Sequence, residues 1–267
     1  MNALEKFAIK HDDWIVIDSP ICSTAYSLTN APECAYLKQR ISELIQSYFN
    51  QWRFTIDAYE KLYNLFAVLN QSNDQITNSN LITEFDVAVI QYEIEFKNYA
   101  YLFIVSLKSL IDLFTCIVDI TQNQVLRSEE QMPDFFTYGR RRNRENYSSE
   151  IMSVFDEQRL SSDDDNWIKK IHLIRNKIIH RGYLLKPIIG FKKSENLIIQ
   201  PYKATNFYDT IDAFDIGLLF KTFLVEMPIL ETRVSGFLLA QISSLKNQPI
   251  IKVMFRYSDL INEYNFG

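Results

Sequence analysis

Apolar residues recur at three- and four-residue steps along much of this chain, which is the pattern of helices that bury one face. The first such segment covers residues 32–69 and opens with a proline, which suits a first helical turn. Residues 70–80 are polar and rich in turn-forming residues, and a second periodic segment covers residues 81–120. The pattern predicts two long helices that form a hairpin.

A third helix is predicted near residues 164–182. Serine and aspartate side chains at 161–165 can accept the free amide hydrogens of a first turn, and their charge suits the helix dipole. Gly182 marks its end, because glycine readily takes the left-handed conformation that closes a helix. Periodicity weakens at 121–165, where we expect an ordered excursion with short helices.

Short apolar runs replace the helical pattern after Gly182. They flank the turn-like sequence KKSEN and predict a β-hairpin with strands near residues 184–191 and 197–202. A fourth helix is predicted at 208–245, with a bend at Pro228 because proline removes a helical hydrogen bond.

Two further apolar stretches, at residues 13–18 and 249–257, are predicted to be strands. The chain has only six glycines and seven prolines, too few turn residues for a many-stranded sandwich or barrel. We therefore expect a mainly α fold with a small β-hairpin. Residues 1–267 would form one domain, with core helices over 32–182 and residues 184–267 as an elaboration.

The composition indicates a globular protein, since 47% of the residues are hydrophobic. The amino terminus lacks the apolar core of a signal peptide, so a cytoplasmic location is expected. The cysteines are odd in number and widely spaced, which argues against a disulfide framework or a zinc site; they are Cys22, Cys34 and Cys116.

Residues 101–120 are the most apolar stretch of the chain. A membrane span there would include Lys108, Asp112 and Asp119, each at a cost of a few kcal/mol, so we predict a buried core helix and no membrane partner. The formal net charge of −5 gives no general attraction to polyanions. An RNA partner would therefore need a local basic patch.

The predicted third helix contains two of the three histidines, within the sequence WIKKIHLIRNKIIHRGY at 167–183. At about 100° per residue, His172, Asn176 and His180 form a polar stripe roughly 80° wide, with Arg175 on its flank. Aliphatic residues border this stripe, which favours a contact surface with a function. The opposite sector is the predicted core face, made by Trp167, Ile171, Ile174 and Ile178.

The stretch RNKIIH, from Arg175 to His180, resembles the signature of the HEPN superfamily. That signature has four to six residues between an arginine and a histidine, often with a polar residue, here Asn176, directly after the arginine. The resemblance extends to the helical layout over 32–182. It implies a dimeric all-α bundle in which the motif helices of two protomers form a ribonuclease site that uses no metal or other cofactor. It also implies a toxin or antiviral effector with RNA as substrate and an antitoxin or other regulatory protein as a candidate partner.

The residue types suit this chemistry. RNA supplies its own nucleophile, the 2′-hydroxyl, so cleavage needs a base, an acid and a cation for the phosphate. The imidazole of His180 can transfer protons, and the guanidinium of Arg175 can hold two phosphate oxygens. Asn176 could orient the imidazole or bind the phosphate. A second copy of the helix would supply a second histidine.

Simpler interpretations exist for the same residues. Arg175 and His180 also suit the dipole at a helix C-terminus without any catalysis. His172 could line the cleft or could serve only at an interface. A metal shared by His172 and His180 is not expected, because about 12 Å separates their Cα atoms along the helix.

Two other segments carry charges that could serve a site. A basic run flanked by aromatic residues suits single-stranded RNA, or else forms a solvated loop that pairs with the acidic run at 163–165; its members are Arg140, Arg141, Arg142 and Arg144. Asp112 could orient His180, but a pair with Lys108 one turn away is the simpler interpretation.

Three functions remain open from the sequence. The first is a metal-independent HEPN-type endoribonuclease. The second is a HEPN-like dimer that binds a nucleotide, RNA or protein without cleavage. The third is a structural helical dimer in which the polar stripe is an interface network.

Overall fold

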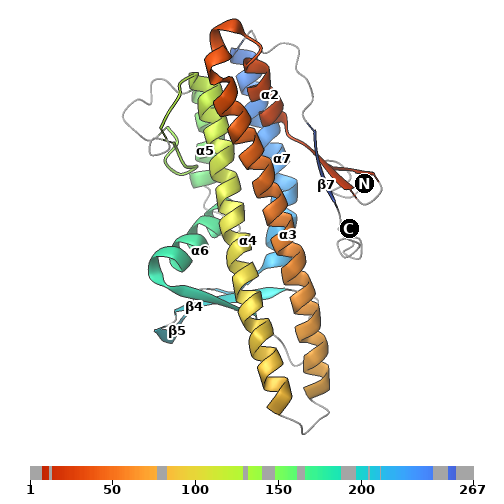
Figure 1. The fold of residues 1–267 in the computed structure, drawn as a ribbon. Coiled ribbons are helices and arrows are strands. Elements are labelled where there is room, and N and C mark those ends of the chain that lie inside the picture. The colour runs from red at the N-terminus through yellow and green to blue at the C-terminus, as the bar shows by residue number, and fades with distance from the viewer. Residues whose placement is uncertain are drawn as a thin grey trace. The chain divides into compact units, whose positions relative to one another are not determined.

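A computed structural model of the chain describes residues 8–11, 14–76, 83–128, 132–139, 148–160, 166–187, 197–203, 205–210, 212–242 and 252–256. Helices make up most of these residues, so the predicted mainly α class is confirmed (Figure 1). In chain order the elements are β1 (Ala8–His11), β2 (Trp14–Asp18), α2 (Pro20–Leu28), the 3-10 helix η1 (Pro32–Leu37), α3 (Lys38–Ile76), α4 (Thr83–Asn123), α5 (Ser149–Leu160), α6 (Trp167–Arg181), β3 (Tyr183–Pro187), β4 (Ile198–Lys203), β5 (Asn206–Thr210), β6 (Phe214–Asp215), α7 (Ile216–Gln241) and β7 (Lys252–Arg256).

The predicted pair of long helices corresponds to α3 and α4. Pro32 starts the 3-10 turn η1, and α3 begins only at Lys38. The predicted turn at 70–80 is wrong for residues 70–76, which continue α3. These residues include no glycine or proline, so nothing in their side chains forces the helix to stop. Residues 77–80 lie outside the described part of the chain.

The predicted hairpin is present as β3 and β4, which pair antiparallel with Tyr183 opposite Lys203. The predicted start of the fourth helix at 208 is wrong, because residues 206–210 form β5 on the other edge of β4. The short strand β6 also pairs with β4, and α7 starts directly after it at Ile216. Residue preferences within residues 206–215 did not predict these two strands, because both strands form by pairing with β4.

A second antiparallel sheet joins the two ends of the chain. Its order is β1-β2-β7, with Trp14 of β2 opposite Arg256 of β7. The strands predicted at 13–18 and 249–257 are therefore confirmed, and pairing between them places β2 in the middle.

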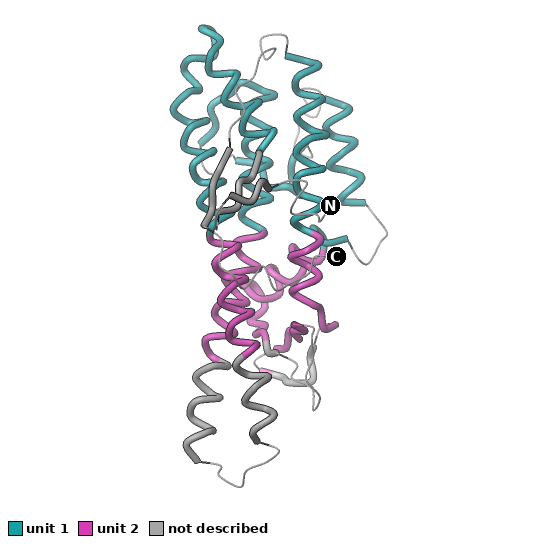
Figure 2. The backbone as a smooth tube through the Cα atoms, turned by 90° about the vertical axis from the view of Figure 1, so that its right-hand side faces the viewer, with its two compact units in different colours: residues 1–53, 108–169, 223–267 teal, residues 54–107, 170–222 magenta. Residues whose placement is uncertain are grey.

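The described residues group into two compact units (Figure 2). Unit 1 contains residues 1–53, 108–169 and 223–267, and unit 2 contains residues 54–107 and 170–222. Four helices, α3, α4, α6 and α7, contribute residues to both units. The expectation of a single domain stays a prediction.

Each unit has an aromatic core to which α7 contributes. In unit 1 the ring of Trp52 from α3 lies 4.6 Å from that of Phe223. In unit 2 the rings of Tyr59 and Phe220 stack at 4.1 Å, and Phe103 of α4 lies 5.8 Å from Phe220. The helix that was expected to be an elaboration therefore supplies core residues in both units.

Within the described residues, one helical span, Ile94–Asn123 of α4, is long and apolar enough to cross a membrane. Most of it is buried inside the protein, including Phe103, Leu110 and Phe114, which have no exposed surface. This agrees with the predicted buried core helix at 101–120.

The residues between α4 and α6 include an anchored turn. Arg159 of α5 is almost fully buried, and its guanidinium lies 5.2 Å from the ring of Phe155. Its Nε donates to the carbonyl oxygen of Phe135 at 2.8 Å, and its Nη2 donates to that of Tyr138 at 2.9 Å. These bonds tie residues 135–138 to α5, as expected for an ordered excursion.

A carboxyl group is buried in the core of unit 1. Glu231 of α7 is 1% exposed, and its two oxygens accept hydrogen bonds at 2.5 Å from the hydroxyls of Ser19 and Tyr48. Burial raises the pKa of Glu231 to about 7, although both hydroxyls and the main-chain amide of Ile21 act to lower it. The protonated form is thus the better tolerated one in the folded chain.

This carboxyl should make stability depend on pH. Between about pH 4.5 and about pH 7 the folded chain keeps a proton that the unfolded chain has lost, so the free energy of unfolding falls as pH rises and levels off above about pH 7. Glu231→Gln should remove this slope and raise the free energy of unfolding above pH 7 by up to roughly 3 kcal/mol. Urea denaturation at a series of pH values measures both effects. Glu33→Gln, an exposed control, should keep the wild-type slope, and a wild-type slope in Glu231→Gln would contradict the prediction.

Candidate functional site

Helix α6 carries the predicted site, and its two ends are fixed by local bonds. It begins at Trp167, and Asn166 caps it by accepting a hydrogen bond from the amide of Lys169 at 2.9 Å. It was expected to begin near residue 164, with serines and aspartates at 161–165 as caps, and those five residues lie outside the described part. Gly182 has φ +67°, which confirms the predicted left-handed end.

The predicted faces of α6 are present. Trp167, Ile171 and Ile174 are buried, and Ile178 is half-buried. On the polar side His180 is exposed, and the other three predicted site residues are half-buried; they are His172, Arg175 and Asn176. Leu173 and Ile179 border the stripe and are 49% and 39% exposed.

The four predicted site residues on α6 form one hydrogen-bonded chain. Nη1 of Arg175 lies 3.2 Å from Nε2 of His180 and 3.1 Å from Oδ1 of Asn176. Nδ2 of Asn176 lies 2.9 Å from Nε2 of His172. The angle between Arg175 and His180 around the helix is about 140°, so the long arginine side chain bridges it by reaching around the surface.

Donor and acceptor roles can be assigned to the four hydrogen-bonded side chains in one consistent way. A guanidinium only donates, so Nε2 of His180 and Oδ1 of Asn176 both accept from Arg175. The Asn176 amide nitrogen then donates to Nε2 of His172. Each histidine therefore holds an unprotonated Nε2 in this arrangement.

Helix α6 itself carries basic and no acidic side chains. Among the described residues no carboxylate pairs with Arg175, and α6 has no acidic residue. Nζ of Lys177 lies 5.0 Å from the ring centre of Tyr183, close enough for a cation–π contact. The part of α6 in unit 2 has four cations in a chain of net charge −5; they are Lys170, Arg175, Lys177 and Arg181. The sequence contained this signal, which a helix-by-helix count of charge would have found.

The other predicted charged groups lie elsewhere. Arg140, Arg141, Arg142 and Arg144 lie outside the described residues, so their predicted role in RNA binding stays a prediction.

The simpler interpretation of Asp112 is confirmed. Its two oxygens lie 2.5 and 2.6 Å from Nζ of Lys108, and one accepts from the amide of Phe135 at 3.2 Å. Burial raises the pKa of Asp112, while Lys108 and the Phe135 amide act against this. Asp112 thus has a structural role in fixing the turn at Phe135.

Among the described residues, no three His, Cys, Asp or Glu side chains come together as metal ligands. Cys22, Cys34 and Cys116 are buried free thiols. No family model, curated protein or solved structure matches the chain. The geometry of the candidate α6 site and the resemblance of its motif are therefore the two indications of a function.

The hydrogen bond from Arg175 predicts the tautomer of His180. In the neutral ring the proton should sit on Nδ1, because Nε2 accepts from the guanidinium. ¹⁵N NMR of histidine-labelled protein distinguishes the two ring nitrogens, and His180→Ala assigns the signal. Arg175→Ala should remove the preference for Nδ1, whereas Arg181→Ala, which removes the neighbouring cation, should keep it. A protonated Nε2 in neutral His180 of the wild type would contradict the assigned bond.

Proposed function

We propose that this chain is a metal-independent endoribonuclease of the HEPN type, which cleaves RNA through attack by the 2′-hydroxyl. The observation that carries the proposal is the direct contact between Arg175 and His180 at the end of α6, without a carboxylate partner among the described residues. The charge of Arg175 is directed at an imidazole and is not neutralised by a described carboxylate. Such a pair is available for a phosphate and its neighbouring hydroxyl.

Arg175 is the phosphate ligand in this proposal. Its guanidinium presents a planar fork that can donate two parallel hydrogen bonds to phosphate oxygens. Only Nη1 has partners among the described residues, so Nη2 and Nε are free to donate to a ligand. Asn176 holds the guanidinium from one side and thereby limits its rotation.

His180 transfers the proton. A phosphate that draws Arg175 toward itself releases Nε2 of His180, which then accepts the proton of the 2′-hydroxyl. The 2′-oxygen forms a bond to phosphorus while the bond from phosphorus to the 5′-oxygen breaks. A second, protonated imidazole gives its proton to that oxygen. The products are a 2′,3′-cyclic phosphate and a 5′-hydroxyl.

A second copy of the chain is the proposed source of the other imidazole. Leu173 and Ile179 expose large apolar surfaces on either side of the polar stripe, and Leu184 of β3 is 43% exposed. Apolar surface around a polar centre is typical of protein interfaces. Two α6 helices related by a twofold axis would bring two Arg175–His180 pairs to one cleft.

A HEPN-like module that binds RNA, a nucleotide or a protein without cleavage is the second candidate. The net charge of −5 favours it, because most of the protein surface would not attract an RNA strand. In that case Arg175 binds phosphate and His180 is dispensable.

Cleavage of RNA in excess EDTA tests the proposal. Purified protein is incubated with total RNA and a tRNA pool, beside Arg175→Ala and His180→Ala variants that are shown to be folded and dimeric. Wild type should produce cyclic-phosphate ends, and each variant should be slower by at least about 100-fold. Arg181→Ala, which removes a neighbouring cation of α6, should keep most of the activity.

The outcomes separate the candidates. RNA binding that survives in His180→Ala but not in Arg175→Ala, without cleavage by the wild type, would support the binding module. If the wild type neither cleaves nor binds RNA, both the endoribonuclease and the RNA-binding candidate are contradicted.

The proposed interface has its own test. Leu173→Asp and Ile179→Asp should shift the protein from dimer to monomer in sedimentation equilibrium, because a buried carboxylate without a partner opposes association. Val125→Asp is the matched control, since Val125 is 48% exposed outside α6 and should leave the dimer intact. Loss of the dimer should also reduce cleavage. A monomeric wild type would contradict the composite site.

A further inference from the structure

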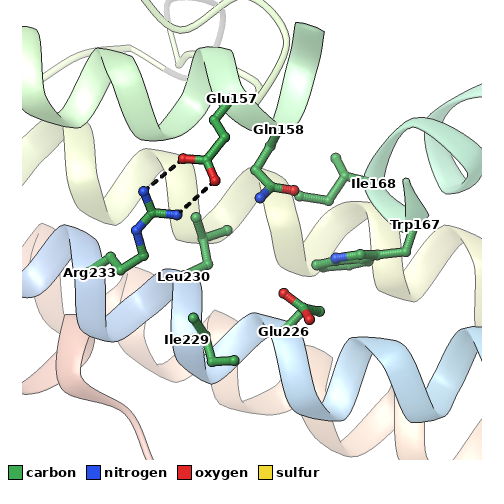
Figure 3. A pocket seen from close by; sticks show the side chains of 8 residues that line it. All are labelled: Glu157, Gln158, Trp167, Ile168, Glu226, Ile229, Leu230 and Arg233. Carbon is green, nitrogen blue, oxygen red and sulfur yellow. Dashed lines mark hydrogen bonds and ion pairs between the residues drawn. The ribbon is translucent and has the colours of Figure 1, made fainter. Parts of the chain in front are cut away.

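A pocket in unit 1 lies between three helices and takes no part in the proposed RNA site. Its walls come from Glu157 and Gln158 of α5, the first turn of α6 and one face of α7 (Figure 3). Its cavity volume is about 90 Å³. This is room for a short alkyl chain or the end of a long side chain, and is well below the size of pockets that hold drug-sized ligands.

Local bonds hold the walls in place. Asn166, which caps α6, donates from Nδ2 to the main-chain oxygen of Gln158 at 3.0 Å and lies 3.3 Å from its side-chain oxygen. The end of α5 is thereby tied to the start of α6. Trp167 is 5% exposed and its ring packs against Phe223 of α7 at 5.6 Å, so the indole wall is fixed as well.

The charges of the pocket do not balance. Glu157 and Arg233 form a two-pronged ion pair, with N–O distances of 3.2 and 2.7 Å, and so neutralise each other. Glu226 forms no hydrogen bond or ion pair with any described residue. In Figure 3 its carboxylate lies beside Trp167, while the Glu157–Arg233 pair lies at the other end, with Leu230 between them. One negative charge therefore remains at the Trp167 end.

Apart from Gln158, the remaining lining is apolar. Leu230 and Ile168 are buried, and Ile229 is 41% exposed at the edge of the pocket. Aliphatic carbons can pack on Ile229 and on the small exposed parts of Leu230 and the indole while a terminal cation reaches Glu226. An anion would meet the carboxylate unfavourably, and an uncharged ligand would leave it without a partner.

We propose that this pocket binds an alkylammonium group, with Glu226 as the charge partner and Trp167 and Leu230 as contacts for the aliphatic stem. A lysine side chain of a partner protein and a free polyamine share this chemistry. The inference is independent of the ribonuclease proposal, because all of its residues belong to unit 1 and none is part of the α6 motif.

The test uses the full-length protein labelled with 5-fluorotryptophan and ¹⁹F NMR. The chain has three tryptophans, and Trp14→Phe and Trp167→Phe assign their signals. Titration with n-butylammonium should move the Trp167 signal to saturation and should move it more than that of Trp52, which is buried on the same Phe223 ring but does not line the pocket. Butyrate and n-butanol, which match the ligand in length, should move the Trp167 signal much less.

Glu226→Gln keeps the size of the side chain and removes the charge. It should weaken n-butylammonium binding at least about 10-fold, while Glu33→Gln, the same change at an exposed position, should not. Thermal unfolding by circular dichroism checks that both variants are folded. Wild-type affinity in Glu226→Gln, equal shifts with n-butanol, or no shift of Trp167 with n-butylammonium would each overturn the proposal.

Two further probes distinguish the sources of the ammonium group. Tighter binding of lysine blocked at both its amino and carboxyl ends than of putrescine would assign the pocket to a protein side chain. The reverse order would assign it to a free polyamine.

Discussion

Aromatic rings of α7 packed against α3 are the contact on which both compact units depend. Trp52 meets Phe223 in unit 1, and Tyr59 stacks on Phe220 in unit 2. Large rings remove much apolar surface from water at little cost in side-chain entropy, so they dominate the energetics of a core. Through these contacts α7 supplies core residues in both units, although it follows the segment that resembles a known family.

Buried polar groups restrict how those cores can pack. Glu231, Arg159 and Lys108 are almost fully buried, and each has hydrogen-bond partners. A buried charge without partners is strongly unfavourable, so each of these groups favours one arrangement of its neighbours. Arg159 and Lys108 both act on the turn at 135–138, the first directly and the second through Asp112. Two independent cationic groups thus hold the segment that precedes the basic run at 140–144.

Helix α6 has a structural face and a face that carries the candidate site. One face is buried, and the other carries the chain of Arg175, Asn176, His180 and His172. The first turn of the same helix forms a wall of the pocket in unit 1. The two proposed sites use opposite charges: the α6 site is basic and suits a phosphate, whereas the pocket is acidic and suits an ammonium group. Their ligands would therefore not compete.

The sequence by itself determined the helical class, the buried nature of the apolar helix, the end of α6 at Gly182 and the division of α6 into a buried face and a polar face. These features depend on local periodicity, on one backbone conformation and on residues within two turns of one helix. Tertiary structure decided the rest. Strands β5 and β6 exist because β4 offers pairing partners, and β2 pairs with β7 from the far end of the chain. The burial of Glu231 and the unbalanced charge of Glu226 likewise depend on side chains brought together from distant segments, which no local pattern records.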